Sequence, residues 1–484
     1  MAGLDQYEVV IGLEVHAQLL TDSKMYCPCS AQYAAAAPNT HVCPICLGLP
    51  GALPVINRKA VENTVLTGLA LNCEIPPFAK FDRKNYPYPD LMKGYQISQY
   101  DAPLCVRGWL DCEVAGERRR VGITRVHLEE DVAKLLHVSE RGESYSLIDV
   151  NRSGVPLMEI VSEPDIRSAE EARQYLVQLR AILRFLGVSS GNMEEGSFRC
   201  DANISLRPLG SDTLGAKVEV KNMNSFRAVF RAMEYEAVRQ AEVLASGGRI
   251  EQETRGWLEA KGITVSQRSK EYAHDYRYFP EPDLPPLELA PSWVDDLRRR
   301  LPELPAAKLA RLQEQYGLPA YDARLLTAEP GPAQYFDRLV ATYPNAKVAS
   351  NWITGELFRL LNASGKQIEE SPIGPESLAE LLTMVDRGEV SNSAAKVALE
   401  EMFASGQSAA AAVTAKGLAQ ISDESGLAAV VRQAIAANPQ SAADYRAGKK
   451  QALGFLVGQV MRASQGKANP AVVNRLLAAE LEKR

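Results

Sequence analysis

The strongest constraint on the fold is a strict two-residue alternation that recurs in the first 293 residues. Apolar side chains occupy every odd position from Val9 to Ala17, and the even positions between them include Glu14 and His16. The same pattern returns in RCDANISLR, KVEVKN and ITRVHLEED. Because a strand sends successive side chains to opposite faces, these segments predict an antiparallel sheet with one apolar and one polar face.

The polar face of this predicted sheet is rich in groups that bind cations. Its members from four segments are Glu14, His16, Glu129, Glu159, Asp201 and Asn203. An ordinary solvated face is one interpretation of this pattern. If the strands are neighbours, however, the carboxylates converge and repel one another unless a cation lies among them. Mg²⁺ prefers carboxylate oxygens and nucleotide phosphates, so the pattern indicates a metal–nucleotide site.

The segment HLEED leaves one choice open. Alternation with Arg125 and His127 favours Glu129 for the polar face. Strand ends often bulge, so Glu130 remains an alternative ligand.

Nucleotide binding would have to use this sheet, because the sequence has neither G-x-x-x-x-G-K-[ST] nor G-x-G-x-x-G. Arg83 and Lys84, in the turn-rich stretch FDRKNYPYPD, are candidates to hold phosphates. The alternative, that Arg83 and Lys84 are solvated side chains of a loop without a ligand, fits the sequence equally well.

Four of the eight cysteines form a second motif within residues 27–46. Cys27 and Cys29 are followed, after 13 residues, by Cys43 and Cys46. Two close pairs of thiolates suit tetrahedral Zn²⁺ with no position open for substrate, so we predict a structural zinc knuckle. His41 is an alternative ligand, although an exposed loop histidine explains it as well.

Three regions of the chain differ in the spacing of their apolar residues. Residues 1–293 carry the alternating segments, and residues 294–408 and 409–484 show apolar spacing of three and four, which is typical of helices. The proline-rich stretch EPDLPPLELAPSW and the stretch ASGQSAAAAV mark the expected boundaries. The sequence therefore predicts an α+β fold with a sheet domain followed by two helical domains.

The end of the last region is basic, whereas the chain as a whole is acidic. Residues 432–484 contain nine Lys or Arg against three Asp or Glu, a net charge of +6 in a chain whose total is −6. A solvated helical face and a phosphate-backbone contact surface both fit this excess. The cations of such a surface would be Lys449, Lys450, Arg462, Lys467 and Arg475.

Composition agrees with a cytoplasmic protein. Hydrophobic residues make up 46% and charged residues 24%, so the chain has enough apolar surface for a core. No apolar run approaches the ~20 residues needed to span a bilayer, and the first residues lack the features of a signal peptide. We expect a cytoplasmic location and no membrane contact.

Long stretches of the sequence resemble one family. They include IGLEVHAQL, CPICLGLPGALPV, KFDRKNYPYPD, HLEEDVAK, DVNRSGVPLMEIVSEPD, MEEGSFRCDANIS, VEVKNMNSF and GFLVGQVMRASQGKANPAVVN. The family is the GatB subunit of the aspartyl/glutamyl-tRNA(Asn/Gln) amidotransferases. The resemblance implies a cradle domain with the glutamine synthetase and guanidino-kinase fold, a helical domain and a YqeY-like, tRNA-binding tail.

The resemblance also implies an activity. Such a protein uses ATP to phosphorylate the side-chain carboxylate of Glu-tRNA(Gln) or Asp-tRNA(Asn), and ammonia then displaces the phosphate. The resemblance implies Mg²⁺ at the kinase site and, in many members, Zn²⁺ at the knuckle. The catalytic and metal-binding motifs of the family match Glu14, His16, Glu129, Glu130 and Glu159. For magnesium, we expect Glu14, His16, Glu130 and Glu159, with Glu129 and Glu130 as alternatives.

Further residues of the predicted sheet are assigned to the substrate. Arg83, Lys84, Arg199 and Lys221 are expected at a phosphate or carboxylate, since arginine suits a bidentate grip on either group. Asp201 and Asn203 are secondary candidates by strand alternation.

Ammonia is expected to come from a partner, because the chain shows no glutaminase triad and no Ser-Lys amidase signature. The resemblance implies a heterotrimer with an amidase subunit and a small third subunit, and it leaves an association with an aminoacyl-tRNA synthetase open. The residues that line a channel for ammonia cannot be read from the sequence. Nor does the sequence decide between Glu-tRNA(Gln), Asp-tRNA(Asn) or both. A small-molecule ligase or guanidino-type kinase, and a non-catalytic tRNA-binding scaffold, are the alternative functions.

Overall fold

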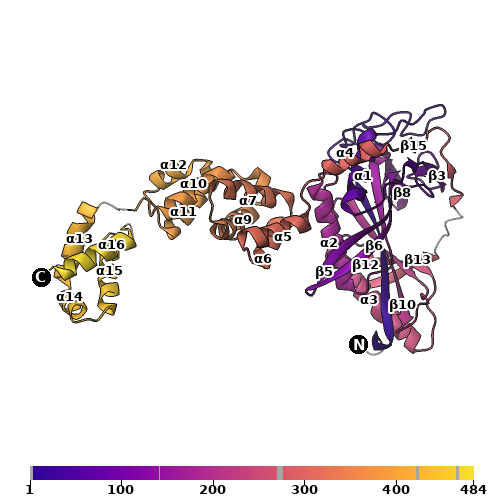
Figure 1. Ribbon diagram of the computed structural model, residues 1–484. Helices are drawn as coiled ribbons and strands as arrows, with labels where there is room; N and C mark the ends of the chain where they lie inside the picture. Colours follow the sequence, from indigo (N-terminus) through magenta and orange to yellow (C-terminus); the bar gives the residue numbers. More distant parts are fainter. Residues whose placement is uncertain (1–3, 141, 270–275, 421–423, 465–467, 484) are drawn as a thin grey trace. The chain divides into compact units, whose positions relative to one another are not determined.

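The computed structural model describes residues 4–140, 142–269, 276–420, 424–464 and 468–483 (Figure 1). The chain divides into two compact units, Met1–Pro305 and Ala306–Arg484. The first unit contains the sheets and the second is helical, so the prediction of an α+β fold with an N-terminal sheet domain and a helical region after it is confirmed.

An eight-stranded sheet forms the framework of the first unit. Its strands in chain order are β1 (Tyr7–Gln18), β5 (Cys105–Val114), β6 (Glu117–Glu130), β9 (Pro156–Ser162), β10 (Phe198–Pro208), β11 (Val218–Lys221), β12 (Glu253–Leu258) and β13 (Ile263–Ser269). Their order in space is β13-β12-β11-β10-β1-β9-β6-β5, and every pairing except β11 with β12 is antiparallel. The segments with the clearest alternation therefore lie near the centre of one sheet.

Three helices cover the apolar face of this sheet. They are α1 (Arg58–Ala70), α2 (Ala169–Phe185) and α3 (Phe226–Ala245), and each begins at a side-chain cap, Asn57, Ser168 and Ser225 respectively. The odd-numbered residues of β1 from Ile11 to Ala17 are buried beneath them in the largest hydrophobic core. The even-numbered residues consequently point to the other face.

Smaller elements surround the polar face and the sheet edges. A three-stranded sheet has the order β14 (Phe279–Pro280), β3 (Asp82–Asn85), β4 (Tyr95–Ser98). Two further pairs are β2 (Phe78–Ala79) with β15 (Leu287–Glu288), and the exposed hairpin of β7 (Lys134–Glu140) and β8 (Glu143–Asp149). Short helical turns are Leu4–Gln6 and Val150–Arg152, and helix α4 spans Pro291–Arg299. The backbone N–H of Ile97 in β4 donates to the Glu130 side chain, which fixes the three-stranded sheet at the end of β6.

The second unit contains two hydrophobic clusters. Around the first pack α5 (Pro305–Tyr316), α6 (Ala320–Thr327), α7 (Pro330–Thr342), α8 (Ala346–Asn351), the π-helical segment Trp352–Leu357, α9 (Phe358–Ser364), the turn Ile368–Glu370, α10 (Pro375–Asp386), α11 (Asn392–Ser405) and α12 (Ala409–Ala415). The second cluster lies among α13 (Glu424–Ala437), α14 (Pro439–Arg446), α15 (Gln451–Ala463) and α16 (Pro470–Glu482). Among the described helices, none is both long enough and apolar enough to cross a membrane.

Candidate active site

Three side chains meet in one row across the centre of the large sheet. In the strand register, His16 of β1 lies opposite Glu159 of β9, and Glu159 lies opposite His127 of β6. Residues directly opposite in antiparallel strands point to the same face, so all three reach the polar side. His16 is half-buried, and His127 and Glu159 are buried.

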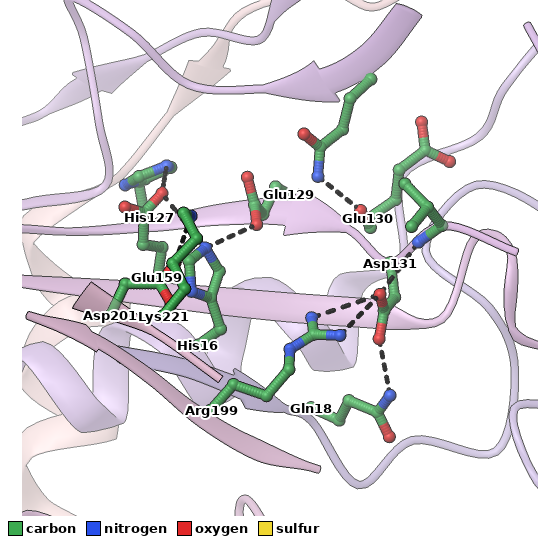
Figure 2. Close-up of polar contacts among 12 residues, drawn as sticks. His16, Gln18, His127, Glu129, Glu130, Asp131, Glu159, Arg199, Asp201 and Lys221 are labelled. Atoms are coloured by element: carbon green, nitrogen blue, oxygen red, sulfur yellow. Dashed lines mark hydrogen bonds and ion pairs between the residues drawn. The ribbon is translucent and has the colours of Figure 1, made fainter. Parts of the chain in front are cut away.

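Glu129 completes the group from the next position of β6 on that face. His16 Nε2 lies 3.4 Å from Glu129 Oε1 and 3.8 Å from Glu159 Oε2 (Figure 2). One ligand atom each from His16, Glu129 and Glu159 lies within 4.8 Å of the other two. An ion with bonds of about 2.1–2.4 Å holds its ligand atoms at most about 4.2–4.8 Å apart, so this donor set fits a divalent cation.

The electrostatic environment of Glu159 favours its anionic form. Burial alone would raise the pKa of Glu159, but the imidazoles of His127 and His16 and the ammonium of Lys84 hold it well below its usual value. Burial alone would lower the pKa of Lys84, but Glu129, Tyr278 and Glu159 hold it above its usual value. Lys84 Nζ also lies 5.0 Å from the ring centroid of Tyr276. A positive charge therefore already faces the two carboxylates.

A second row of polar groups lies beside the first. Glu14 of β1 is opposite Asp201 of β10, and Asn203 Nδ2 donates to Glu14 Oε1 at 2.9 Å. Lys221 of β11 binds Asp201 at 2.7 Å, and burial would lower the pKa of Lys221, but Asp201 and Glu219 raise it. The structure thus places Glu14 on the predicted face but outside the group of three.

Arg199 belongs to a separate buried network. It lies opposite His16 in the register, and both terminal nitrogens donate to Asp131 Oδ1, at 3.3 and 3.2 Å. Gln18 Nε2 donates to the other oxygen of Asp131 at 2.6 Å (Figure 2). Burial would raise the pKa of Asp131, but Arg199 and Arg152 hold it below its usual value. Asp131 thereby fixes a guanidinium at the border of the site.

Glu130 and Arg83 have partners away from the group of three. Glu130 forms an ion pair with Lys93 and accepts from the backbone of Ile97 at 3.1 Å, and Figure 2 shows its side chain directed away from His16. Arg83 donates to both oxygens of Glu281, at 2.7 and 2.8 Å. The structure brings neither residue to the proposed ligands.

The four knuckle cysteines converge, as their spacing predicts. One sulfur from each of Cys27, Cys29, Cys43 and Cys46 lies within 4.8 Å of the others. The Cys43 and Cys46 sulfurs are 3.9 Å apart, close to the roughly 3.8 Å that tetrahedral zinc with bonds of about 2.3 Å imposes. The donor set therefore fits zinc, and His41 is not part of it.

The thiols of this cluster differ in acidity. A hydrogen bond from Cys27 lowers the pKa of Cys46 to about 4, and the charge of Lys24 contributes. Burial raises the pKa of Cys29 to about 11. Lys24 is only 1% exposed, and its Nζ donates to the backbone oxygens of His41 at 2.8 Å and Val150 at 3.4 Å. A buried cation thus lies beside the thiolates.

The predicted cations of the tail lie at its surface where they are described. Lys449, Lys450, Arg462 and Arg475 are exposed, and Lys449 pairs with Asp444 at 3.1 Å. Lys467 lies outside the described residues.

Sequence reasoning missed three residues that shape these sites. His127 and Asp131 both lie within the segment HLEED, and strand alternation does place His127 beside Glu129, but neither was predicted as a site residue. A single histidine carries little signal, however, and the partner of Asp131 is 68 residues away. Lys24 has no signal in the sequence, because a buried lysine resembles any surface lysine until its surroundings are known.

Comparison with known proteins identifies the family of this chain. A family model described as "GatB/GatE catalytic domain" matches residues 9–295, and one described as "GatB domain" matches residues 334–481. The chain is 59% identical to the GatB subunit of the aspartyl/glutamyl-tRNA(Asn/Gln) amidotransferase of Moorella thermoacetica, covering 98% of this chain and 100% of the relative. It is 58% identical to that of Thermomicrobium roseum, covering 99% of each chain. The sheet with its polar cluster and the helical region after it therefore belong to a member of the GatB family of tRNA-dependent amidotransferase subunits.

Proposed function

We propose that this chain carries the kinase and amidation site of a glutamine-hydrolysing aminoacyl-tRNA amidotransferase. In the first step, ATP phosphorylates the side-chain carboxylate of Glu-tRNA(Gln), Asp-tRNA(Asn) or both, giving an acyl phosphate and ADP. In the second step, ammonia attacks the acyl carbon, phosphate leaves and the amide forms. The observation that supports this proposal is the convergence of His16, Glu129 and Glu159 on the polar face of the sheet.

The two-step route follows from the chemistry of the substrate. A carboxylate is a poor acceptor for ammonia because its leaving group would be oxide, whereas phosphate leaves readily. Phosphoryl transfer needs alignment and neutralisation of charge more than covalent help from the protein. A polar sheet face with fixed carboxylates and cations offers both.

In this proposal the divalent cation is Mg²⁺, held by His16, Glu129 and Glu159. When bound, it would neutralise charge on the transferred phosphoryl group. Glu14, one position along β1 on the same face, would contact the hydration shell of the ion. Glu130, which pairs with Lys93, would support the strand end on which Glu129 lies.

The cations around the group would bind the anionic parts of the substrates. Lys84, which interacts electrostatically with Glu129 and Glu159, and Arg199, fixed by Asp131, are our candidates to bind phosphate or the substrate carboxylate. Lys221 with Asp201 would extend this surface across β10 and β11, and Asn203 would orient Glu14. Arg83 would act indirectly, by fixing β3 through Glu281.

Partners complete the reaction in this proposal. Ammonia is protonated in neutral water, so it would be released by an amidase subunit and protected on its way, with a small third subunit joining the other two. Association with an aminoacyl-tRNA synthetase and a cytoplasmic location, where charged tRNA and ATP are found, belong to the same proposal. The cysteine cluster would hold a structural zinc ion.

The family also suggests finer structural assignments. We assign residues 1–293 to a cradle domain related to glutamine synthetase and the guanidino kinases, 294–408 to a helical domain and 409–484 to a YqeY-like tail. The tail would bind tRNA through Lys449, Lys450, Arg462, Lys467 and Arg475. Its net charge of +6 in residues 432–484 supports this role.

The test is the complete complex with Glu-tRNA(Gln) and Asp-tRNA(Asn), each with and without ATP. We expect ATP-dependent amide formation on one or both tRNAs, and a loss of at least about 100-fold in Glu129→Gln and His16→Ala. Glu117→Gln, at the exposed opposite end of β6, is the matched control and should keep full activity. Normal activity of both site variants would contradict the proposed catalytic site and favour the alternative of a non-catalytic tRNA-binding scaffold. ATP hydrolysis driven by a free amino acid, without tRNA, would favour the alternative of a small-molecule ligase.

A further inference from the structure

His127 is a buried histidine with no assigned role in the site. It is 2% exposed and lies in β6, three residues before the end of the strand, on the same face as Glu129. A lone histidine at such a position usually serves packing, so a role in the site has to follow from its contacts.

Those contacts point to Glu159. His127 Nε2 lies 3.1 Å from Glu159 Oε2, which is closer than His16 Nε2 comes to that oxygen at 3.8 Å. The other nitrogen of His127, Nδ1, is buried and has no hydrogen-bond partner among the described residues. Glu159 is thus the one polar group of the described chain that holds the ring in its orientation.

The strand register makes this contact rigid. His127 and Glu159 are directly opposite on β6 and β9, and His16 extends the same row on β1. Each of the three side chains therefore has its Cα fixed by a strand that is paired on both sides rather than by a loop. Figure 2 shows His127 and His16 converging on Glu159.

A carboxylate with one fixed hydrogen bond can still bind a cation. A carboxylate has about four lone-pair positions, so the bond from His127 leaves the rest available and restricts rotation of the group. Outer partners of this kind orient metal ligands, and their loss typically costs about 10–100-fold in metal affinity.

We propose that His127 is a positioning residue that donates from Nε2 to Glu159 and thereby orients this carboxylate toward the divalent cation. The inference rests on the proposed function only in placing a cation between His16, Glu129 and Glu159. It adds a role for a residue that itself does not contact the ion or the reacting atoms.

The experiment compares two amides at position 127. Glutamine can place its N–H near the position of His Nε2, whereas asparagine is shorter by one methylene group and cannot reach Glu159. Binding of Mn²⁺, as a probe for the Mg²⁺ site, is measured by the electron paramagnetic resonance of free Mn²⁺. The samples are full-length chains in the assembled complex, loaded beforehand with zinc. Thermal melting of each variant reports the structural cost of an amide at this buried position.

We expect His127→Asn to weaken Mn²⁺ binding by at least about 10-fold and His127→Gln to stay within about 3-fold of the wild type, while the two variants lose similar thermal stability. Equal Mn²⁺ affinity of both variants and the wild type would overturn the inference. So would equal weakening in both variants in proportion to their loss of stability, because that result indicates packing alone.

A third variant, Glu159→Gln, distinguishes a failure of the role inferred for His127 from a failure of the proposed function. If Glu159→Gln loses Mn²⁺ binding while His127→Asn keeps it, the cation site stands and the role of His127 is wrong. If Glu159→Gln itself binds Mn²⁺ like the wild type, no cation lies at this carboxylate, and both proposals are wrong.

Discussion

At the scale of single residues, a buried lysine lies beside the cysteine cluster. Four thiolates around Zn²⁺ carry a net charge of about −2, which is unfavourable in a low-dielectric interior unless a cation lies nearby. Lys24 supplies one positive charge and joins the backbone of His41 to that of Val150. With zinc bound, Lys24 would compensate part of this charge as well as join the two backbone segments.

Lys24→Met should therefore impair the knuckle. We expect a loss of roughly 3 kcal/mol in the stability of the sheet domain, because two buried carbonyls lose a charged donor, and about 10-fold faster zinc release to a chelator. Calorimetry and a colorimetric zinc assay measure the two effects. Lys59→Met, an exposed lysine on α1, is the matched control. Unchanged zinc release in Lys24→Met would contradict the charge argument.

Asp131 makes the stability of the folded protein depend on pH. Its pKa is lowered in the folded protein, so its contribution to stability is fully present above the unfolded value of about 3.9 and is lost as the pH falls through the folded value. Asp131→Asn should cost about 1–3 kcal/mol at pH 7, because Arg199, whose side chain is 36% exposed, loses a charged partner. The difference from the wild type should shrink below pH 4. Calorimetry between pH 3 and pH 7 tests this, and a constant difference across the range would exclude Asp131 as the titrating group.

At the scale of elements, the segment directly after α1, residues 71–73, approaches β5 so closely that a glycine is required at position 108. A Cβ on Gly108 would lie 2.3 Å from Cys73 Sγ and 2.6 Å from the backbone oxygen of Leu71. Trp109 N–H donates to that same oxygen at 2.8 Å, so the backbone cannot retreat without losing the bond.

Gly108→Ala should destabilise the sheet domain by about 1–3 kcal/mol through this overpacking. The matched control is Gly355→Ala, since a Cβ there meets nothing within 4 Å and alanine favours the helix. The midpoint of thermal unfolding measures both variants. A stable Gly108→Ala would show that residues 71–73 can shift away from β5.

The same elements show how far sequence patterns reach. Alternation in β1, β6 and β10 predicted which residues share a face, because the period of a strand is local. It could not predict that Glu130, the last residue of β6, turns to Lys93 and Ile97, since that direction depends on where β4 packs. The pairing of Arg83 with Glu281, 198 residues away, was likewise beyond any local pattern. Cysteine spacing did predict that the four sulfurs converge, because each close pair is held together by the local chain.

At the scale of the whole molecule, charge is divided between the regions. Residues 432–484 carry +6, and the remainder of the chain carries −12. An acidic remainder does not attract RNA in general, so the basic tail would supply long-range attraction to tRNA while the sheet domain performs chemistry. This division predicts that tRNA affinity and metal affinity can be changed separately.

Reversal of Lys449 and Lys450 to Glu tests this division, because it lowers the net charge of the tail from +6 to +2. We expect weaker binding of tRNA in filter-binding titrations and a salt dependence of log K that is less steep by about 1.4–1.8, as two phosphate contacts are lost. Mn²⁺ affinity should be unchanged. Because Lys449 pairs with Asp444, the double Lys→Gln variant removes charge without adding repulsion and should give a smaller loss in the same direction. Lys59→Glu, on the sheet domain, is the control for a general change in charge. If the tail variant and this control weaken tRNA binding equally, net charge alone governs affinity, and the tail has no specific part in gripping the tRNA.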